Sequence, residues 1–413
     1  MRPFLGLFLL CLDLLAADAV MAASESWVQM TATGAQARLV TQAASCPEIL
    51  IDGRARTMNE RAAPTEAFPD RVCQADVPRG ARRLKVEGMA LPPLKSRVNR
   101  IVILGDSGCR LKGAVVQNCN DPEAWPFARV AALAAAQKPD LVIHVGDYYY
   151  RETPCPTGVA GCAGSPYGDR WPSWQAELYA PAAPLLAAAP WVFARGNHED
   201  CSRGGAGWFR LLDAAPAPKT CPTSSDTFSV ELAGLRLILV DSAEAADRAA
   251  PAPLVADFDR ELDAMGHPHT GSPGWLITHR PIWYAARNGA ILSDGVTNAT
   301  ERAAVKGRSL AGIDLIVSGH THFFSSLSFG ASRPSQLIVG TGGDILEKRE
   351  VAKPATGDPM IDGLPASIFA MGRFGYFVFD RDGADWVGRF YDVTDAVAAT
   401  CFLHARALKC TPF

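Results

Sequence analysis

The sequence predicts an α/β (α+β) fold in which two mixed β-sheets form a sandwich flanked by helices, with a small β-rich segment at the N-terminus. From residue 99 onward, strand-like and helix-like segments alternate, which is typical of such sandwiches. Five of the strand-like runs are short and apolar and end in a polar cluster, as buried strands of a parallel sheet do. With 413 residues, 48% of them hydrophobic and 20% charged, the chain can bury a large core.

The region after residue 98 contains six predicted single strands and two predicted hairpins. The strands are expected at residues 99–104, 140–145, 191–194, 275–278, 315–318 and 336–339. The hairpins are expected at 228–241, turning at Ala233-Gly234, and at 374–393, turning at Asp382-Gly383. Helices are expected at 123–137, 174–189, 254–265 and 298–310, and prolines 181 and 184 should break the second of them.

The N-terminus resembles a secretory leader. Arg2 precedes an apolar stretch at 4–15, and small residues at 20–22 form a cleavage site. Asp13 interrupts the stretch, which is too short to span a bilayer comfortably, although an uncleaved anchor is the alternative. We therefore expect export to the periplasm or the extracellular space, with residues 1–22 removed and no later membrane association.

Residues 23–98 predict a small β-rich segment with strands near 31–41, 48–52 and 83–86. The segment contains no histidine, so it has no catalytic character. It is either a separate module or an extension packed on the main domain, and Pro92-Pro93 mark its boundary. The expected catalytic domain is then 99–393, followed by a tail at 394–413.

Ten cysteines remain once Cys11 of the leader is set aside, and they fall in neighbouring pairs. Five local disulfides are the simplest assignment, and they fit an oxidising compartment. A thiolate metal site is the alternative, but no CxxC spacing supports it. The five pairs are Cys46 and Cys73, Cys109 and Cys119, Cys155 and Cys162, Cys201 and Cys221, and Cys401 and Cys410.

Five polar clusters carry the chemistry. They are residues 105–108 (GDSG), 146–150 (GDYYY), 196–199 (GNHE), 278–281 (THRP) and 319–322 (GHTH). Together they supply seven oxygen and nitrogen donors: Asp106, Asp147, Tyr150, Asn197, His279, His320 and His322. Such donors suit Fe, Zn or Mn, and seven are too many for one tetrahedral ion but fit two ions that share a carboxylate. Two metals about 3.5–4 Å apart form a site for displacement at phosphorus.

Each cluster alone is a weak signal, because a Gly-Asp pair after a strand is usually a turn and two histidines can be loop residues. A serine hydrolase built on Ser107 is disfavoured, since no histidine precedes it and no Asp-x-x-His follows. A secreted metal-binding protein without catalysis is the remaining alternative of another class. The formal net charge of −3 argues against a general nucleic-acid binder, which needs a basic surface.

The ordered clusters resemble the metallophosphoesterase (calcineurin-like) superfamily, and specifically its purple acid phosphatase branch. That branch carries GDxG, GDxxY, GNH(D/E), an apolar-xxH block and GHxH, which match residues 105–108, 146–150, 196–199, 276–279 and 319–322. Gly108 stands where the wider superfamily has a histidine, and Tyr150 supplies the replacement donor. Tyr148 and Tyr149 are neighbours that could serve instead, but the family spacing selects Tyr150.

The resemblance implies two metal sites. Asp106, Asp147, Tyr150 and His322 would hold Fe(III), and the tyrosinate would give a visible charge-transfer band. Asp147, Asn197, His279 and His320 would hold a divalent ion (Fe, Zn or Mn), with Asp147 as the bridge.

The resemblance also implies that His198 faces the substrate phosphate and protonates the leaving group. Arg280, beside a ligand, either contacts the phosphate or pairs within the structure. Glu199, also a candidate for substrate contact, is expected to orient its loop rather than react.

The function so implied is that of a secreted dinuclear-metal phosphoesterase, which hydrolyses small phosphate monoesters by attack of a metal-bound hydroxide. A phosphodiesterase acting on nucleotides or lipid head groups is the runner-up, because the same metal core serves both. Loops at 151–168, 203–219 and 283–297 are expected to decide between them.

Overall fold

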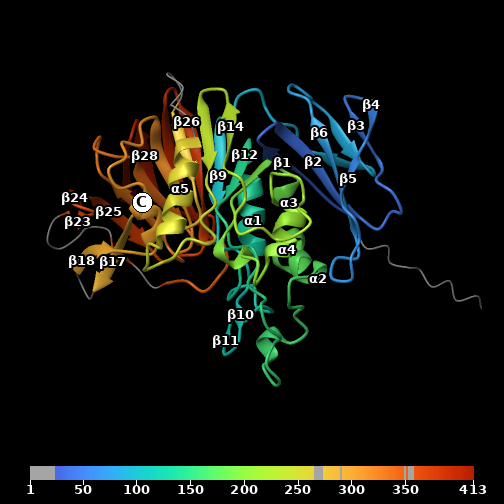
Figure 1. Cartoon of the computed structure of the whole chain (residues 1–413), viewed down its shortest axis with the longest axis horizontal. Helices are drawn as coiled ribbons and strands as arrows, with labels where there is room; N and C mark the ends of the chain where they lie inside the picture. Colours follow the sequence, from blue (N-terminus) through green and yellow to red (C-terminus); the bar gives the residue numbers. More distant parts are fainter. Residues whose placement is uncertain (1–23, 265–272, 289–290, 348–349, 352–357) are drawn as a thin grey trace, which may run out of the picture.

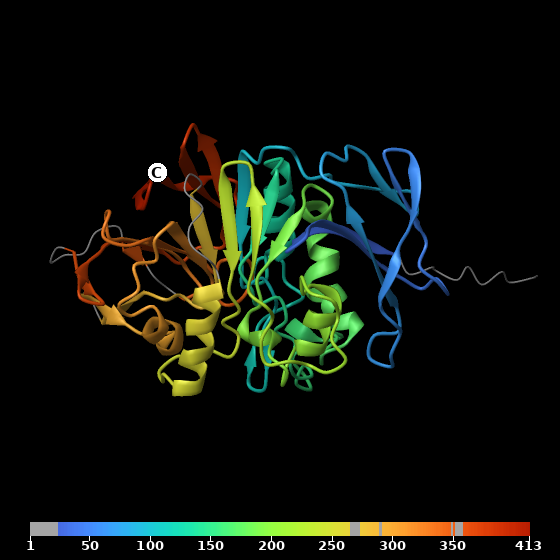
Figure 2. The same ribbon diagram turned by 45° about the horizontal axis from the view of Figure 1, so that its top comes forward.

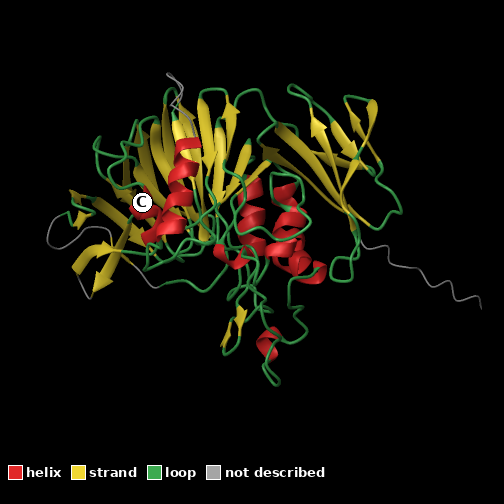
Figure 3. Cartoon of the chain, in the orientation of Figure 1, coloured by secondary structure: helices red, strands yellow, loops and turns green. Residues whose placement is uncertain are grey.

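Two large β-sheets stacked face to face form the centre of the molecule (Figures 1 and 3). The computed structural model describes residues 24–264, 273–288, 291–347, 350–351 and 358–413. The expected leader at 1–22 lies outside the described residues. The sandwich of mixed sheets predicted from the sequence is confirmed.

The first sheet has eleven strands among the described residues. Their order is β29 (Ala407–Pro412), β28 (Val397–His404), β27 (Asp385–Asp392), β26 (Gly375–Asp382), β9 (Arg100–Leu104), β12 (Leu141–His144), β13 (Trp191–Phe193), β1 (Glu25–Thr31), β2 (Gly34–Thr41), β6 (Arg71–Val77) and β5 (Asn59–Ala62). At its centre β9, β12 and β13 run parallel.

The second sheet has eight strands in the part of the chain that is described. Their order is β14 (Phe228–Leu232), β15 (Leu235–Leu239), β16 (Gly274–Ile277), β19 (Ile313–Ser318), β21 (Ser335–Val339), β20 (Phe324–Ser328), β25 (Ser367–Met371) and β22 (Glu350–Val351). The four strands β15, β16, β19 and β21 run parallel.

Six α-helices and several short elements complete the described fold. The helices are α1 (Phe127–Ala136), α2 (Trp171–Trp174), α3 (Ala180–Leu186), α4 (Gly205–Leu211), α5 (Ala252–Ala264) and α6 (Ala299–Ala304). The short helical turns are η1 (Ala160–Cys162), η2 (Gln175–Tyr179) and η3 (Asn197–Glu199). The small strand pairs are β10 (Leu111–Lys112) with β11 (Val115–Val116), β17 (Tyr284–Asn288) with β18 (Ile291–Gly295), and β23 (Met360–Ile361) with β24 (Leu364–Pro365).

Alternation along the central strands produces three apolar layers. Successive side chains of a strand point to opposite faces. Ile101 of β9 and Trp275 of β16 therefore pack between the sheets. Val102 packs with Val130 of α1, outside the first sheet, and Leu276 lies in the core under α5 and α6, outside the second sheet. All six predicted strands are present with ends within two residues, because strands buried on both faces are marked by continuous apolar runs.

The predicted helices needed correction. Residues 171–186 form a nearly continuous helical stretch in which the π-helical turn η2 separates α2 from α3, and Pro181 and Pro184 do not break it. Pro181 lies in the first turn of α3, where a missing N–H is tolerated, and the wider preceding turn makes room for its ring. The helix expected at 298–310 ends already at Ala304, before Gly307 with its φ of 78°.

The N-terminal segment extends the first sheet. The strand expected at 31–41 is β2, which forms a hairpin with β1, a strand that the sequence did not indicate. β1 in turn pairs parallel with β13 (Figure 2). Four other strands of this segment form a separate sheet in the order β4 (Arg54–Thr57), β3 (Glu48–Ile51), β7 (Leu84–Val86) and β8 (Met89–Leu91). At the opposite edge, the expected C-terminal tail forms the β28–β29 hairpin.

All five predicted disulfides are present: Cys46–Cys73, Cys109–Cys119, Cys155–Cys162, Cys201–Cys221 and Cys401–Cys410. Among the described helices, none has both the length and the apolar character needed to cross a membrane. The five disulfides are compatible with an exported protein.

Candidate metal centre

The predicted donors gather where strands of the two sheets end. Asp106 follows β9, Asp147 and Tyr150 follow β12, and Asn197 follows β13. From the second sheet, His279 follows β16, and His320 and His322 follow β19. The two edges meet, because side chains from one sheet lie within hydrogen-bonding distance of side chains from the other.

Tyr150 is the centre of a first group of donors. Its phenol oxygen lies 2.9 Å from Oδ2 of Asp147 and 3.3 Å from Oδ1 of Asp106. The same oxygen lies 3.3 Å from Nε2 of His322. Nδ1 of His322 lies 2.8 Å from the carbonyl oxygen of Ile345, so Nε2 is the nitrogen directed at the group.

His279 is the centre of a second group. Its Nε2 lies 3.1 Å from Oδ2 of Asp147 and 3.2 Å from Oδ1 of Asn197. Its Nδ1 lies 2.7 Å from the carbonyl oxygen of Val145, which fixes the ring. One ligand atom each from Asp147, His279 and His320 lie within 4.8 Å of one another. Asp147 therefore stands between the two groups, where a bridging carboxylate would stand.

Of the three consecutive tyrosines, Tyr150 is the one whose hydroxyl joins the donors. The hydroxyl of Tyr148 donates to the carbonyl oxygen of Ala194 at 2.8 Å, and that of Tyr149 donates to the carbonyl oxygen of Arg151 at 2.9 Å. Both hydroxyls are thus bonded to the backbone, away from the donor group.

Glycines allow the clusters to pack against one another. A Cβ at Gly196 would lie 2.2 Å from Oδ1 of Asp147, and one at Gly319 would lie 2.3 Å from Oδ2 of Asp106. A Cβ at Gly108 would lie 2.7 Å from Cδ2 of Tyr150. The ring of Tyr150 therefore occupies the space that a side chain at position 108 would need, which fits the exchange of a histidine there for the tyrosine.

Burial and charge set opposite protonation states on the donor histidines. Burial disfavours the charge of Asp147, yet attraction to the His279 and His198 rings holds the pKa of Asp147 well below its usual range. Burial of the His279 ring would lower its pKa, but attraction to Asp147 outweighs this effect and raises it. Burial lowers the pKa of His320 to about 4, whereas Asp344 and Asp106 outweigh burial and raise the pKa of His322 to about 9. A bound cation would make all three rings neutral, because ligand imidazoles lose their extra proton.

His198 lies beside the donors without joining either group. Its Nε2 is 4.0 Å from Oδ2 of Asp147, and its Nδ1 is 2.6 Å from Oε1 of Glu152. Lys112 and Arg203 approach the same carboxylate at 3.4 and 3.7 Å. Burial lowers the pKa of His198, although the negative charges of Asp147 and Glu152 favour its charged form.

Glu199 is not placed to contact a substrate, so this expectation needs correction. Its side chain is fully buried, and its two oxygens accept backbone N–H groups of Asp147, Gly196, Tyr148 and Tyr149 at 2.8–3.0 Å. A carboxylate has about four acceptor positions, so these bonds use its capacity. Glu199 instead joins the second cluster to the third, as a loop-orienting residue.

Arg280 is held within the structure. Its guanidinium forms an ion pair with Asp247, and its Nε donates to the carbonyl oxygen of Ser242 at 3.2 Å. Its Nη1 also lies 3.2 Å from Nε2 of His320. Arg280 thus adjoins the second group through His320 and is anchored by its remaining side-chain contacts to the loop at 242–247.

Four neighbours of the site were missed by the sequence analysis: Arg110, Glu152, Arg203 and Asp344. Asp344 has no exposed side-chain surface and pairs with Arg110, whose Cζ lies 4.7 Å above the ring of Tyr150. Charged residues in loops are ordinary in a sequence, and the partners of Asp344 lie far away along the chain. The one available signal was position, since each follows a polar cluster or the glycines at 342–343 within a few residues.

Comparison with known proteins finds one matching family and several similar solved structures. The model of the calcineurin-like phosphoesterase family matches residues 99–324. No curated protein has a sequence that matches this chain. The solved structure of purple acid phosphatase PPD1 from yellow lupin (Lupinus luteus) seeds is similar over 94% of this chain and 74% of that chain, with 13% identity and a TM-score of 0.59. A structure of PhoD is similar over 94% of this chain and 91% of that chain, with 13% identity and a TM-score of 0.56. At such identity these structures share the fold alone.

Proposed function

Because its family model covers more than half of its length, the chain belongs to the calcineurin-like phosphoesterase family, and we propose that it is an exported phosphomonoesterase of the purple acid phosphatase type. Hydrolysis of phosphoesters with two metal ions is the activity of this family. The observation that carries the finer proposal is the phenol oxygen of Tyr150, which lies within 3.3 Å of Asp106, Asp147 and His322.

The donor set fits a pair of hard or borderline cations. The first group offers carboxylate, phenol and imidazole, which suit Fe(III), and the second offers amide oxygen and imidazole around the shared carboxylate, which suit a divalent Fe, Zn or Mn. All the donors are largely buried, and ring nitrogens turned away from the site are fixed by backbone carbonyls in His279 and His322. When bound, two such cations would acidify a water molecule and offset negative charge on the phosphoryl oxygens.

The chain's own residues would handle the leaving group. The Glu152 carboxylate, 2.6 Å from Nδ1 of His198, would stabilise the imidazolium, from which Nε2 can donate a proton to the departing alcohol. Lys112 and Arg203 stand beside this pair and would favour the two negative charges of a monoester over the single charge of a diester.

Metal analysis with a visible spectrum tests the metal assignment. We expect about two metal ions per chain, at least one of them iron, and a pink to violet protein. A colourless protein holding two zinc ions would remove the tyrosinate assignment and leave the hydrolase assignment standing.

Turnover of p-nitrophenyl phosphate against its bis ester tests the substrate class. Faster hydrolysis of the monoester is expected. Preference for the bis ester would support the phosphodiesterase alternative, and turnover of neither ester by the metal-loaded protein would support a metal-binding role without catalysis.

A further inference from the structure

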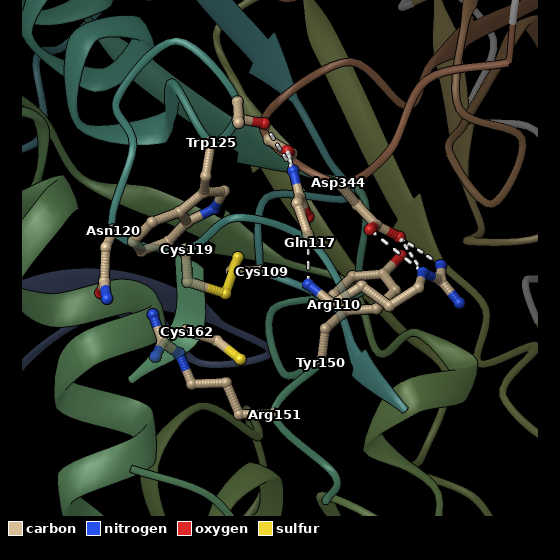
Figure 4. The surroundings of a disulfide bond; sticks show 12 residues. Cys109, Arg110, Gln117, Cys119, Asn120, Trp125, Tyr150, Arg151, Cys162 and Asp344 are labelled. Carbon is tan, nitrogen blue, oxygen red and sulfur yellow. Dashed lines mark hydrogen bonds and ion pairs between the residues drawn. A yellow bond between two sulfur atoms is a disulfide. The ribbon is translucent and has the colours of Figure 1, made fainter. Parts of the chain in front are cut away.

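A charged pair lies against the ring of Tyr150 (Figure 4). Nε of Arg110 donates to the two carboxylate oxygens of Asp344 at 3.1 and 3.0 Å, and Nη2 donates to the same carboxylate. The Asp344 side chain has no exposed surface, and that of Arg110 is 18% exposed. Cζ of Arg110 lies 4.7 Å from the centroid of the Tyr150 ring. The pair is therefore largely shielded from water, and its guanidinium lies over the aromatic ring.

The same pair also touches the histidine of the first donor group. Oδ2 of Asp344 lies 3.4 Å from Nδ1 of His322, whose Nε2 is directed at Tyr150. Two members of the first group, the tyrosine and a histidine, thus share one neighbouring carboxylate–guanidinium pair. In the second group, the ion pair of Arg280 and Asp247 instead meets a ligand ring at its edge, with Nη1 of Arg280 3.2 Å and Oδ1 of Asp247 3.3 Å from Nε2 of His320.

Gln117 fixes the positions of Arg110 and Asp344 relative to each other. The backbone N–H of Arg110 donates to Oε1 of Gln117 at 3.0 Å, and the N–H of Gln117 donates back to the carbonyl oxygen of Arg110 at 2.8 Å. Nε2 of Gln117 donates to the carbonyl oxygen of Gly343, the residue before Asp344, at 2.8 Å. The Cys109–Cys119 disulfide closes the loop that carries Arg110 and Gln117. The position of the pair is therefore built into the fold.

We propose that Arg110 and Asp344 are positioning residues that set how strongly the Tyr150 phenolate donates electrons to the metal of the first site. A cation over the face of an aromatic ring lowers the energy of the ring electrons, and a nearby carboxylate raises it. Both charges act at short range in a poorly solvated environment, where screening by salt is weak. The inference rests on the proposed function, because it needs iron bound by Tyr150.

The two charges predict opposite spectral shifts. Arg110→Gln removes the cation and leaves the carboxylate, so the phenolate electrons rise in energy and the visible band moves to longer wavelength. Asp344→Asn removes the carboxylate and leaves the cation, so the band moves to shorter wavelength. In the double variant the effects oppose each other, and its band lies between those of the single variants.

Two further variants separate tuning from stability. Arg110→Lys keeps the charge but loses the planar face against the ring, and we expect a shift to longer wavelength that is smaller than that of Arg110→Gln. Arg38→Gln removes a buried arginine of β2 that donates to the carbonyl oxygens of Leu211 and Asp213. This control should lower the melting temperature and leave the band unmoved.

Visible absorption and iron content are measured together for every variant. The tuning proposal is overturned if iron-loaded single variants keep the wild-type maximum or shift in the same direction. Should a single variant fail to fold or lose its iron, the Arg110→Lys variant decides, and a band identical to that of the wild type overturns the proposal. A colourless wild-type protein overturns the proposed function together with the tuning, whereas a coloured wild type with unmoved variants overturns the tuning alone.

Discussion

Three of the seven donors belong to residues with left-handed backbone conformations, which non-glycine residues rarely adopt. Asp106, Asp147 and His320 have φ values of 54°, 59° and 67°. Such a conformation costs on the order of 1–3 kcal/mol and persists only where the surroundings impose it. Here hydrogen bonds to the backbone hold two of these residues in place, because Glu199 accepts the N–H of Asp147 and Asp106 accepts the N–H of His320. The strain aims side chains from separate strands at one point.

Asp147→Asn tests the bridging role without disturbing this backbone. Asparagine tolerates the left-handed region, so the variant removes the negative charge and keeps the fold. We expect loss of both metals and a fall in kcat of at least about 100-fold. Asp106→Asn, whose carboxylate serves one group, should lose one metal. Two retained metals in Asp147→Asn, measured by elemental analysis, would contradict the bridge.

His198→Ala should keep its metals and lose about 100- to 1000-fold in kcat on a substrate with a poor leaving group. The loss should be much smaller with 2,4-dinitrophenyl phosphate, whose leaving group departs without a proton. Glu152→Gln, which keeps a hydrogen-bond acceptor near Nδ1 but removes the charge, should cost about tenfold. Equal losses of His198→Ala on both substrates would show that His198 is not the acid.

The donors were predictable because each lies at a fixed spacing within a short cluster at a strand end. Their supporting residues were not. Glu152 meets His198, and Arg110 meets Asp344, only after the sheets bring distant segments together. No local pattern encodes such a pairing. The same holds for Glu199, whose role follows from four backbone donors that a sequence does not display.

At the scale of elements, burial on both faces decided what could be predicted. The central strands were evident as apolar runs, whereas β4, β5 and β6 lie near one edge of the molecule and carry many polar side chains. Helix ends were less evident. Pro181 and Pro184 suggested a break, but the helical stretch continues through both prolines after the π-helical turn η2. A π-helical turn leaves no mark in the apolar periodicity of a sequence, so it could not be predicted.

Glu301 joins α6 to the end of β16 and makes the fold sensitive to pH. Its carboxylate is fully buried and accepts hydrogen bonds from Thr278 at 3.1 and 3.2 Å and from Asn298. Burial raises its pKa from 4.5 to about 8. Between these values the folded chain holds a proton that the unfolded chain releases, so stability falls as pH rises, by at most about 1.4 kcal/mol per pH unit.

Glu301→Gln should remove this dependence, because the amide stays neutral. We expect melting temperatures close to wild type at pH 5 and a variant that is more stable than wild type at pH 8. Glu123→Gln, at an exposed glutamate, is the matched control and should follow wild type at every pH. A gap between Glu301→Gln and wild type that is constant from pH 5 to 8 would show that Glu301 is ionised in the fold.

At the scale of the whole molecule, the order of strands could not be predicted. β26 lies beside β9 although more than 270 residues separate them in sequence, and β1 lies beside β13 although about 160 do. The sequence left open whether residues 23–98 are a separate module or an extension. Strand pairing makes their first hairpin part of the central sheet (Figure 1).

Two buried arginines of the N-terminal segment donate hydrogen bonds to backbone carbonyl oxygens at residues 209–215. Arg38 donates to the carbonyl oxygens of Leu211 and Asp213 at 2.6 and 2.7 Å. Arg61 donates to four carbonyl oxygens between Phe209 and Ala215 at 2.8–2.9 Å. These carbonyls lie at the C-terminal end of α4, where helix carbonyls lack partners within the helix and favour cations. The N-terminal segment thus supplies the cap of a helix that begins next to the His198 loop.

Arg61→Met should therefore destabilise the β-sandwich that carries the donor residues, and not only the N-terminal segment. Methionine fills similar space but leaves buried carbonyl oxygens without donors, which should cost about 3 kcal/mol. The expected result is a single thermal transition at lower temperature, with faster proteolysis near residues 209–215. Arg54→Met, at an exposed position of β4, should behave as wild type. If Arg61→Met instead leaves the main transition unchanged, or produces a separate early transition, residues 23–98 are an independent module, and α4 does not depend on them for its C-terminal cap.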